Sequence, residues 1–315
     1  MRRSNGASSY QSTSNKAKIL GARWSEPGQL LMHHGSFDKT IEPVDTVPGS
    51  VYLWTDREVN MADERTLKAE GEFQYLEAGK GEPLILLHGL FGALSNFGPL
   101  FEHFKDKYHV LVPILPLYTL PMLSTNVDNL AKFLDRFIQH TGFKHVNIIG
   151  NSLGGHVALV YCSRKPEMVR SLVLTGSSGL YENAFGGGFP RREDKDFIKK
   201  KVAVTFFDPK HATDELVEEC YETINDRAKL IRILSLAKSA IRHNMATEIP
   251  KLKMPVLLIW GKQDTITPPH VAEEFHTLIP HSELHWIDEC GHAAMMEHPN
   301  QFNAILEKWL AKTLV

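Results

Sequence analysis

The segment GNSLGG at residues 150–155, centred on Ser152, has the residue types of a nucleophile site. The apolar run 146–149 before it predicts a buried strand, and the segment opens a helix that we expect to run from Leu153 to Arg164. A tight turn from strand to helix strains the serine backbone and exposes its hydroxyl, and glycines avoid collisions in such a turn. We therefore predict that Ser152 is a nucleophile; a glycine-rich loop that only caps a helix is the simpler alternative.

Two further residues have the types and positions that an activated serine needs. A serine hydroxyl is a poor nucleophile at neutral pH, so it requires a general base and a carboxylate that orients this base. His292, which follows a predicted strand at 283–287, is our candidate for the base. For the carboxylate we prefer Asp264, which follows the apolar run 255–260, to Asp288, because Asp288 lies only four residues from the histidine.

The segment HGLFG at residues 88–92 directly follows another apolar run that predicts a buried strand. A loop with two glycines can aim a backbone N–H at a bound carbonyl oxygen. We predict an oxyanion hole formed by the N–H groups of Leu90 and Leu153, with Phe91 as the alternative donor; loss of one such donor costs about 3 kcal/mol. His88 is expected to be a structural histidine that hydrogen-bonds the loop.

The elements that must position these residues alternate between strand and helix from about Arg65 onward, which predicts an α/β fold with a mostly parallel, doubly wound sheet. The predicted nucleophile, acid and base would then converge at the carboxyl ends of its strands. We expect Ser124 to be the N-cap of a helix that contains Val127 and Ile138. The other predicted strands are 72–78, 83–87, 109–114 and 171–174, and the other predicted helices are 95–105 and 299–314.

The alternation fails in two segments. Residues 1–60 are rich in polar residues, Gly and Pro without a sustained period, and we predict a mostly disordered tail. An organelle transit peptide, or an extraneous extension before a native start at Met61, are the alternative interpretations. Residues 180–250 contain the glycine run 186–188 and a charged helical stretch, and we expect a helical lid there. The hydrolase-type core would comprise residues 65–179 and 251–315.

The composition limits the partners. A hydrophobic fraction of 43%, a charged fraction of 23% and a net charge of −2 do not favour nucleic acid as a partner. No apolar run is long enough to span a bilayer. The three cysteines, Cys162, Cys220 and Cys290, form neither a paired framework nor a zinc motif, and a dinucleotide fingerprint is missing. We therefore expect a cytoplasmic protein that acts on a small molecule with no cofactor and no metal.

The motifs HGLFG, GNSLGG, WGKQD and CGH resemble those of the α/β-hydrolase superfamily over roughly residues 72–314. The order Ser152, Asp264, His292 is that of its catalytic triad, so the resemblance implies the α/β-hydrolase fold and a serine hydrolase. The segments 206–216 and 282–298 are similar to hydrolases of meta-ring-cleavage products, which break a C–C bond in vinylogous 1,5-diketones. Epoxide hydrolases and haloalkane dehalogenases are excluded, because they carry an aspartate in place of the serine.

The chain departs from the ring-cleavage hydrolases at positions that concern the substrate. Cys220 stands where those enzymes usually have a lid arginine that holds the substrate carboxylate, and Ala293 replaces a tryptophan. We therefore expect a hydrolase that cleaves an apolar carboxylic ester or related acyl compound through an acyl-enzyme. Two alternatives stay open: C–C bond hydrolysis by the same residues, and a ligand receptor that retains the pocket without turnover.

Overall fold

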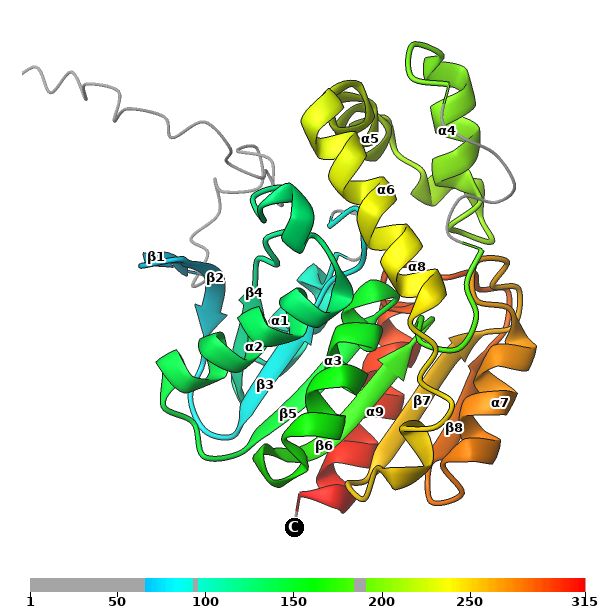
Figure 1. Cartoon of the computed structure of the whole chain (residues 1–315). Coiled ribbons are helices and arrows are strands. Elements are labelled where there is room, and N and C mark those ends of the chain that lie inside the picture. Colours follow the sequence, from blue (N-terminus) through cyan, green and yellow to red (C-terminus); the bar gives the residue numbers. More distant parts are fainter. Residues whose placement is uncertain (1–65, 93–95, 184–190, 315) are drawn as a thin grey trace, which may run out of the picture. The chain divides into compact units, whose positions relative to one another are not determined.

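The computed structural model describes residues 66–92, 96–183 and 191–314. The predicted tail at 1–60 and the glycine run at 186–188 lie outside these residues. The described strands form a single eight-stranded sheet (Figure 1). These strands are β1 (Thr66–Glu70), β2 (Phe73–Ala78), β3 (Pro83–Leu87), β4 (His109–Pro113), β5 (Val146–Asn151), β6 (Val169–Thr175), β7 (Val256–Gly261) and β8 (Glu283–Ile287).

The sheet has the order β1-β2-β4-β3-β5-β6-β7-β8. β2 pairs antiparallel with β1 and β4, whereas all the pairs from β4 to β8 are parallel. The prediction of a mostly parallel sheet is thus confirmed, although β1 was not predicted as a separate strand. Because parallel strands end at the same edge, the loops after β3, β5, β6, β7 and β8 all emerge there.

Helices cover both faces of the sheet, which explains why β3, β5 and β7 are buried along their whole lengths. One hydrophobic cluster joins the sheet to α2 (Val127–Thr141), α3 (Leu153–Arg164) and α7 (Pro269–Leu278). A second cluster joins the other face to α1 (Gly98–Phe104), α8 (Ala294–Glu297) and α9 (Pro299–Thr313). The predicted helices at 95–105, at 153–164, at 299–314 and around Val127 and Ile138 are confirmed, with α1 shorter than predicted, whereas α7 and α8 were not predicted.

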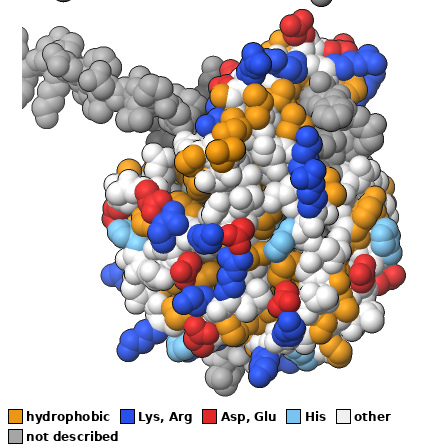
Figure 2. All heavy atoms as spheres, in the orientation of Figure 1, with side chains coloured by type: hydrophobic (Ala, Val, Ile, Leu, Met, Phe, Trp, Pro, Cys, Tyr) orange, Lys and Arg blue, Asp and Glu red, His pale blue; other side chains and the backbone are white. Residues whose placement is uncertain are grey.

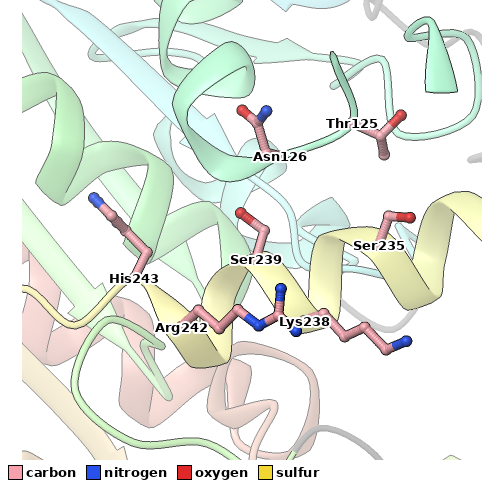
Figure 3. A pocket seen from close by; sticks show the side chains of 7 residues that line it. All are labelled: Thr125, Asn126, Ser235, Lys238, Ser239, Arg242 and His243. Atoms are coloured by element: carbon pink, nitrogen blue, oxygen red, sulfur yellow. The ribbon is translucent and has the colours of Figure 1, made fainter. Parts of the chain in front are cut away.

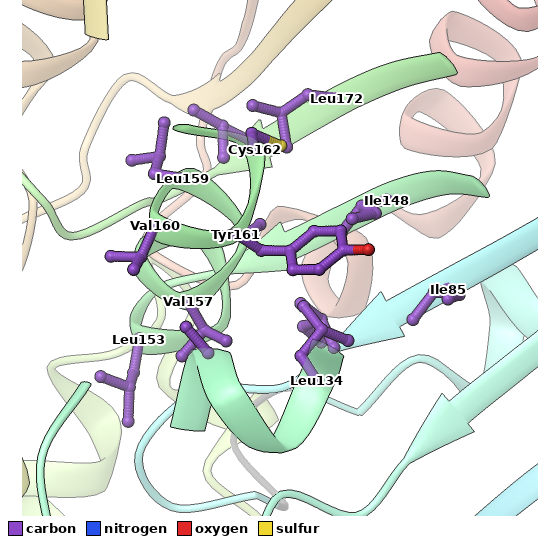
Figure 4. Packing of buried hydrophobic residues seen from close by; sticks show 14 of the residues in the cluster. Ile85, Leu134, Ile148, Leu153, Val157, Leu159, Val160, Tyr161, Cys162 and Leu172 are labelled. Atoms are coloured by element: carbon purple, nitrogen blue, oxygen red, sulfur yellow. The ribbon is translucent and has the colours of Figure 1, made fainter. Parts of the chain in front are cut away.

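Helix α3 is buried on all sides from Leu153 to Cys162. Such a helix has no solvent-facing polar stripe, which is typical of a helix in the centre of a domain. Figure 4 shows Val157 and Tyr161 of α3 beside Leu134 of α2, among side chains from the sheet. The start of α3 is therefore held firmly at the carboxyl edge of the sheet.

Helix α2 begins at a different cap from the one predicted. Asn126 has an extended backbone, and its side-chain oxygen accepts a hydrogen bond from the N–H of Asn129 at 2.9 Å. Ser124 instead ends the short 3-10 helix η2 (Met122–Ser124). The prediction of Ser124 as N-cap is wrong, because only Asn126 directly precedes the first helical residue and can reach the third one.

In the described residues between β6 and β7, the chain forms the α-helices α4 (Lys195–Ala203), α5 (Asp214–Asn225) and α6 (Arg227–Arg242). Figure 1 shows them beyond the carboxyl ends of the parallel strands. We call residues 191–250, which belong to the predicted lid at 180–250, the lid region. Ile231 and Ile241 of α6 are exposed, and Figure 2 shows hydrophobic atoms at the surface over this helix. The remaining 3-10 helices are η3 (Pro166–Met168), η4 (Pro209–His211) and η5 (Ile249–Lys251).

None of the helices in the described ranges combines the length and the apolar character that crossing a membrane requires.

Candidate active site

Ser152 lies in the turn between β5 and α3 with a φ of 54° and a ψ of −122°. A residue other than glycine in such a conformation carries a strain of about 1–3 kcal/mol, so its neighbours must hold it. The N–H of Ser152 donates to the carbonyl oxygen of Thr175 at 3.2 Å, and its own carbonyl accepts from the N–H of Ser178 at 3.1 Å. The loop after β6 thus fixes the turn that carries the serine.

The glycines around Ser152 are required by close backbone packing. A Cβ on Gly154 would lie 2.0 Å from the carbonyl oxygen of Leu87 at the end of β3. A Cβ on Gly150 would lie 2.5 Å from the Cα of Gly155. The prediction that side chains would collide in this turn is confirmed.

Asp264 follows β7 and His292 follows β8, and their side chains are paired in the interior. They are 1% and 6% exposed, and Nδ1 of His292 donates to Oδ2 of Asp264 at 2.8 Å. The same carboxylate accepts hydrogen bonds from the N–H groups of Ile266 and Thr267 and from the Thr267 hydroxyl, all at 2.8–2.9 Å. Because the carboxylate accepts a hydrogen bond from Nδ1–H, the proton of the neutral imidazole stays on Nδ1. Nε2 is then the basic nitrogen.

Asp288, the rival acid, has different partners. It is exposed and accepts hydrogen bonds from Lys262 and from the side-chain amide of Gln263, each at 3.0 Å. The hydrogen bonds from Gln263 and Lys262 lower the pKa of Asp288 to about 2. The carboxylate that pairs with His292 in the structure is therefore that of Asp264.

The His292 loop and the Ser152 turn meet at the end of β6. The side-chain amide of Asn151 donates to the carbonyl oxygens of Thr175 and His292, at 2.9 and 3.3 Å. A Cβ on Gly176, whose φ is +51°, would lie 2.8 Å from Nδ1 of His292, so the imidazole lies directly against this glycine. Over the described ranges no hydrogen bond joins the Ser152 hydroxyl to the imidazole.

The two predicted oxyanion donors belong to adjacent segments. Leu153 is the first residue of α3, so its N–H lies outside the hydrogen-bond pattern of the helix. Leu90 is in a turn closed by a hydrogen bond from the N–H of Gly92 to the oxygen of Gly89 at 3.2 Å. Because Gly154 packs against the backbone of Leu87 and His88, this turn lies close to the start of α3.

His88 has the structural role that we expected. It is buried; Nδ1 donates to the carbonyl oxygen of Gly89, and Nε2 accepts from the N–H of Leu115, both at 3.0 Å. These two bonds require the neutral form, and burial lowers the pKa of His88 to about 4. The histidine therefore links the loop after β3 to the segment after β4.

Glu297 is a site residue whose role sequence analysis missed. Its buried carboxylate accepts hydrogen bonds from the N–H of Gly291 at 2.6 Å and from the N–H of Phe207 at 2.8 Å. The N–H of His292 in turn donates to the carbonyl oxygen of Thr205 at 2.8 Å. The segment that follows α4 in the lid region is thus attached to the loop that carries His292. A glutamate five residues after a histidine gives no sequence signal for such backbone contacts.

Two other histidines, one in the core and one at the end of the lid helix α6, form a hydrogen-bonded pair. Nε2 of His156 on α3 is 2.9 Å from Nδ1 of His243, which follows α6. Burial and the charge of His243 lower the pKa of His156 to about 3. His243 also lines a cavity of about 480 Å³ between α2 and α6 (Figure 3). Its lining is Thr125, Asn126, Ser235, Lys238, Ser239, Arg242 and His243, so it contains none of the predicted catalytic residues.

Cys220, which stands where a lid arginine is expected from the resemblance, lies on α5 and is 3% exposed. Burial, followed by the nearby charge of Glu219, raises the pKa of its thiol to about 12. The side chain is therefore neutral at physiological pH and supplies no positive charge for a substrate carboxylate. Ala293, in place of a tryptophan, is also buried.

Comparison with known proteins places this chain in a family. A family model described as the alpha/beta hydrolase fold matches residues 82–299. The chain belongs to the α/β-hydrolase fold family. The superfamily and the fold predicted from the sequence motifs are thereby confirmed.

Individual relatives within the α/β-hydrolase fold family differ in their named substrates. The chain is 46% identical to MGS-MChE2, an alpha/beta hydrolase enzyme from the metagenome of lagoon sediments of Mar Chica, Morocco, over 78% of this chain and 98% of that one, with a TM-score of 0.65. It is 28% identical to a 2-hydroxy-6-oxononadienedioate/2-hydroxy-6-oxononatrienedioate hydrolase from Pseudomonas sp., over 77% of this chain and 93% of the relative. Lipase 3 from Moraxella sp. is 26% identical, over 69% of this chain and 73% of the lipase.

Proposed function

We propose that this α/β hydrolase is a serine hydrolase that cleaves a carboxylic ester or a related acyl compound through an acyl-enzyme on Ser152. The observation that carries the proposal is the buried hydrogen bond between His292 and Asp264, beside the strained turn of Ser152. A strained turn at this position has no evident structural benefit, whereas an exposed hydroxyl next to an oriented base serves nucleophilic catalysis.

In the proposed acylation step, Oγ of Ser152 attacks the carbonyl carbon while Nε2 of His292 accepts the hydroxyl proton. The carbonyl oxygen becomes an oxyanion, which the N–H groups of Leu90 and Leu153 would stabilise. Asp264 would hold the imidazole in place and stabilise its positive charge. When the tetrahedral intermediate collapses, the imidazolium donates its proton to the leaving alkoxide, and an acyl-serine remains.

Deacylation would repeat these steps with water as the nucleophile. His292 accepts a proton from the water, and the resulting hydroxide attacks the acyl carbon. Collapse of the second tetrahedral intermediate returns the proton to Oγ of Ser152 and releases a carboxylic acid. The two steps balance with water as the only co-reactant, so the proposed reaction requires no cofactor.

The second candidate function is hydrolysis of a C–C bond in a ring-cleavage product by the same residues. The similarity to the Pseudomonas hydrolase over 93% of that protein favours it. The neutral, buried Cys220 favours the ester hydrolase function, because it leaves the predicted position of the lid arginine without a cation for a substrate carboxylate. The similarity to a lipase is compatible with an acyl ester substrate.

The test is a panel of p-nitrophenyl esters of increasing chain length, assayed beside a ring-cleavage dienoate. We expect ester turnover by the wild-type chain and a loss of about 10⁶-fold in kcat for Ser152→Ala. Ser163→Ala removes a hydroxyl from the same helix, where it donates only to the carbonyl of Val160, and should retain activity. Circular dichroism checks that both variants fold.

The outcomes separate the candidate functions. Turnover of the dienoate without the esters would favour C–C hydrolysis. A chain that is neither active on the panel nor labelled at Ser152 by a fluorophosphonate would be a receptor rather than an enzyme.

We also propose a cytoplasmic location and a small apolar substrate as partner. The three cysteines are buried and free, which fits a reducing compartment. Fractionation of the source cells with an antibody against the chain tests the location, and recovery in a secreted or organelle fraction would contradict it.

A further inference from the structure

The loop after β6 contacts each of the three segments that hold the proposed catalytic residues. The N–H of Ser178 binds the carbonyl oxygen of Ser152 at 3.1 Å, and Gly176 lies against the ring of His292. The N–H of Asn183 donates to the carbonyl oxygen of Ile266 at 2.7 Å, within the loop that carries the acid. A charged residue in this loop is therefore placed to influence the chemistry at the site.

Glu182 is such a residue. Its partly buried carboxylate accepts a hydrogen bond from the hydroxyl of Ser178, the same residue whose N–H holds the Ser152 turn. Burial raises the pKa of Glu182, while the hydrogen bond from Ser178 and the nearby charge of His292 lower it. Ser178 thus attaches the carboxylate of Glu182 to the Ser152 turn, and the next residue, Asn183, is bonded to the loop that carries Asp264.

The proposed reaction has no step for this second carboxylate. Asp264 already orients the imidazole, and Glu182 has its own hydroxyl partner. A carboxylate that lies beside the reacting centre without taking part in the reaction affects substrate choice. It repels a negatively charged group of the substrate strongly, because little water screens the two charges. Discrimination against a competing substrate commonly uses such a repulsive element.

We propose that Glu182 is a specificity-determining residue that makes the site select neutral acyl substrates over substrates with a carboxylate near the reacting carbonyl. The proposal rests on the ester hydrolase function and names its substrate class. It agrees with the absence of a cation at Cys220, since a site built for an anionic substrate would need a positive partner and no second carboxylate.

Selection by Glu182 should depend on pH in a defined direction. The carboxylate repels an anion only when it is ionised, so the preference for the neutral substrate should grow as the pH rises. The hydroxyl of Ser178, from the same loop, donates to Glu182, and the charge of His292, from the loop after β8, lowers the pKa of this carboxyl group. Both substrates need the same general base, so the protonation of that base changes their kcat/KM values by the same factor. This factor cancels in the ratio of the two kcat/KM values.

The first measurement compares two esters with the same six-carbon acyl chain. p-Nitrophenyl hexanoate ends in a methyl group, and mono-p-nitrophenyl adipate ends in a carboxylate. For Glu182→Gln, which keeps an oxygen for the Ser178 hydroxyl, we expect kcat/KM for the adipate ester to rise at least tenfold relative to the hexanoate ester. The exposed Glu193 offers the matched control: Glu193→Gln removes the same charge and should leave this ratio unchanged.

The second measurement does not depend on ester turnover. Two fluorophosphonates, with methyl-ended and carboxylate-ended chains, label Ser152 at rates followed by mass spectrometry between pH 6 and 9. The wild-type preference for the neutral probe should increase with pH, and the preference in Glu182→Gln should be weaker and flat.

These outcomes distinguish the two proposals. Labelling with the expected ratios but no ester turnover would support the role of Glu182 and refute the ester function. Equal ratios in wild type and Glu182→Gln, or no labelling at all, would overturn the role of Glu182.

Discussion

Two buried histidines, one in the loop after β8 and one in the first turn of α3, show how a partner decides what an imidazole can do. His292 pairs with the carboxylate of Asp264, and His156, one turn into α3 from the Ser152 turn, pairs with a second histidine, His243. Both rings are almost completely buried. The carboxylate of Asp264 accepts a hydrogen bond from Nδ1 of His292, whereas burial and the charge of His243 lower the pKa of His156 to about 3.

The difference assigns different tasks to the same side chain. An imidazole that must accept and return a proton needs a partner that tolerates its positive charge, and only the ring beside Asp264 has one. The ring beside His243 stays neutral at physiological pH and can serve only as a hydrogen-bonding link between α3 and the lid region. Substitutions in or beside the two pairs can test this difference.

Among changes at or beside the two histidine pairs, the largest effect is expected for Asp264→Asn. The amide would donate to Nδ1 of His292 and so put the imidazole proton on Nε2, where it blocks transfer from the Ser152 hydroxyl. We expect kcat to fall about 10⁴-fold, the size of effect that a wrong tautomer has in a Ser-His-Asp triad. Ester hydrolysis at saturating substrate is the measurement.

Asp288→Asn is the control for this prediction, because it makes the same change on an exposed carboxylate that binds Lys262 and Gln263. It should keep kcat within about twofold of the wild-type value. Similar losses in the two variants would mean that Asp264 has no special role in orienting the base.

The sequence predicts those features of the fold and the site that are set by residues close together in the chain. The bounds of α3 match the prediction at both ends, because the glycines at 150 and 154 and Pro166 mark its limits locally. The N-cap of α2 was misplaced by two residues, because Ser124 and Asn126 are both good caps and only the backbone conformation decides between them.

Contacts between distant segments could not be predicted in this way. The pair His156–His243 spans 87 positions, and the bonds of Glu297 to residue 207 span 90. The apolar residues around His156 predict a buried helix, but no residue around either histidine or the glutamate indicates which distant segment supplies the partner. Such partners become visible only when the packing of the lid region on the core is known, which is also why Glu182 was not among the predicted site residues.

A smaller effect is expected for Gly176→Ala. The new Cβ would lie 2.8 Å from Nδ1 and from the carbonyl oxygen of His292, so the imidazole must move away from its partner. A displacement of about 1 Å at a catalytic group can lower activity about 100-fold, and we expect kcat/KM to fall between about 10- and 100-fold.

Gly142→Ala is the matched control for the change at Gly176. Both glycines have a positive φ, but a Cβ on Gly142 has no atom within 4 Å. Both variants should therefore lose about 1 kcal/mol of stability from the left-handed backbone, and only Gly176→Ala should lose activity. Urea unfolding and ester kinetics on the same samples check the prediction, and equal activities would show that the glycine does not position the ring.

The smallest effect concerns stability in acid and tests the other histidine pair. The pKa of His156 in the folded chain, about 3, lies below the ordinary value of about 6.5. As the pH falls below 6.5, the unfolded chain binds a proton that the folded chain does not, so stability is complete above this pH and decreases toward pH 3. From pH 7 to pH 5 this group alone should remove about 2 kcal/mol of unfolding free energy.

His156→Gln should weaken this acid dependence, because glutamine does not titrate. His88, with a pKa of about 4, would contribute in the same direction and would remain in the variant. Thus the loss of unfolding free energy between pH 7 and 5 should become smaller without disappearing. His145→Gln replaces an exposed histidine and should leave the loss unchanged. Urea unfolding at several pH values measures this loss of unfolding free energy. An equal loss in wild type and His156→Gln would contradict the prediction. It would mean that His243 is a partner beside which the buried ring can be protonated, as Asp264 is proposed to be for His292.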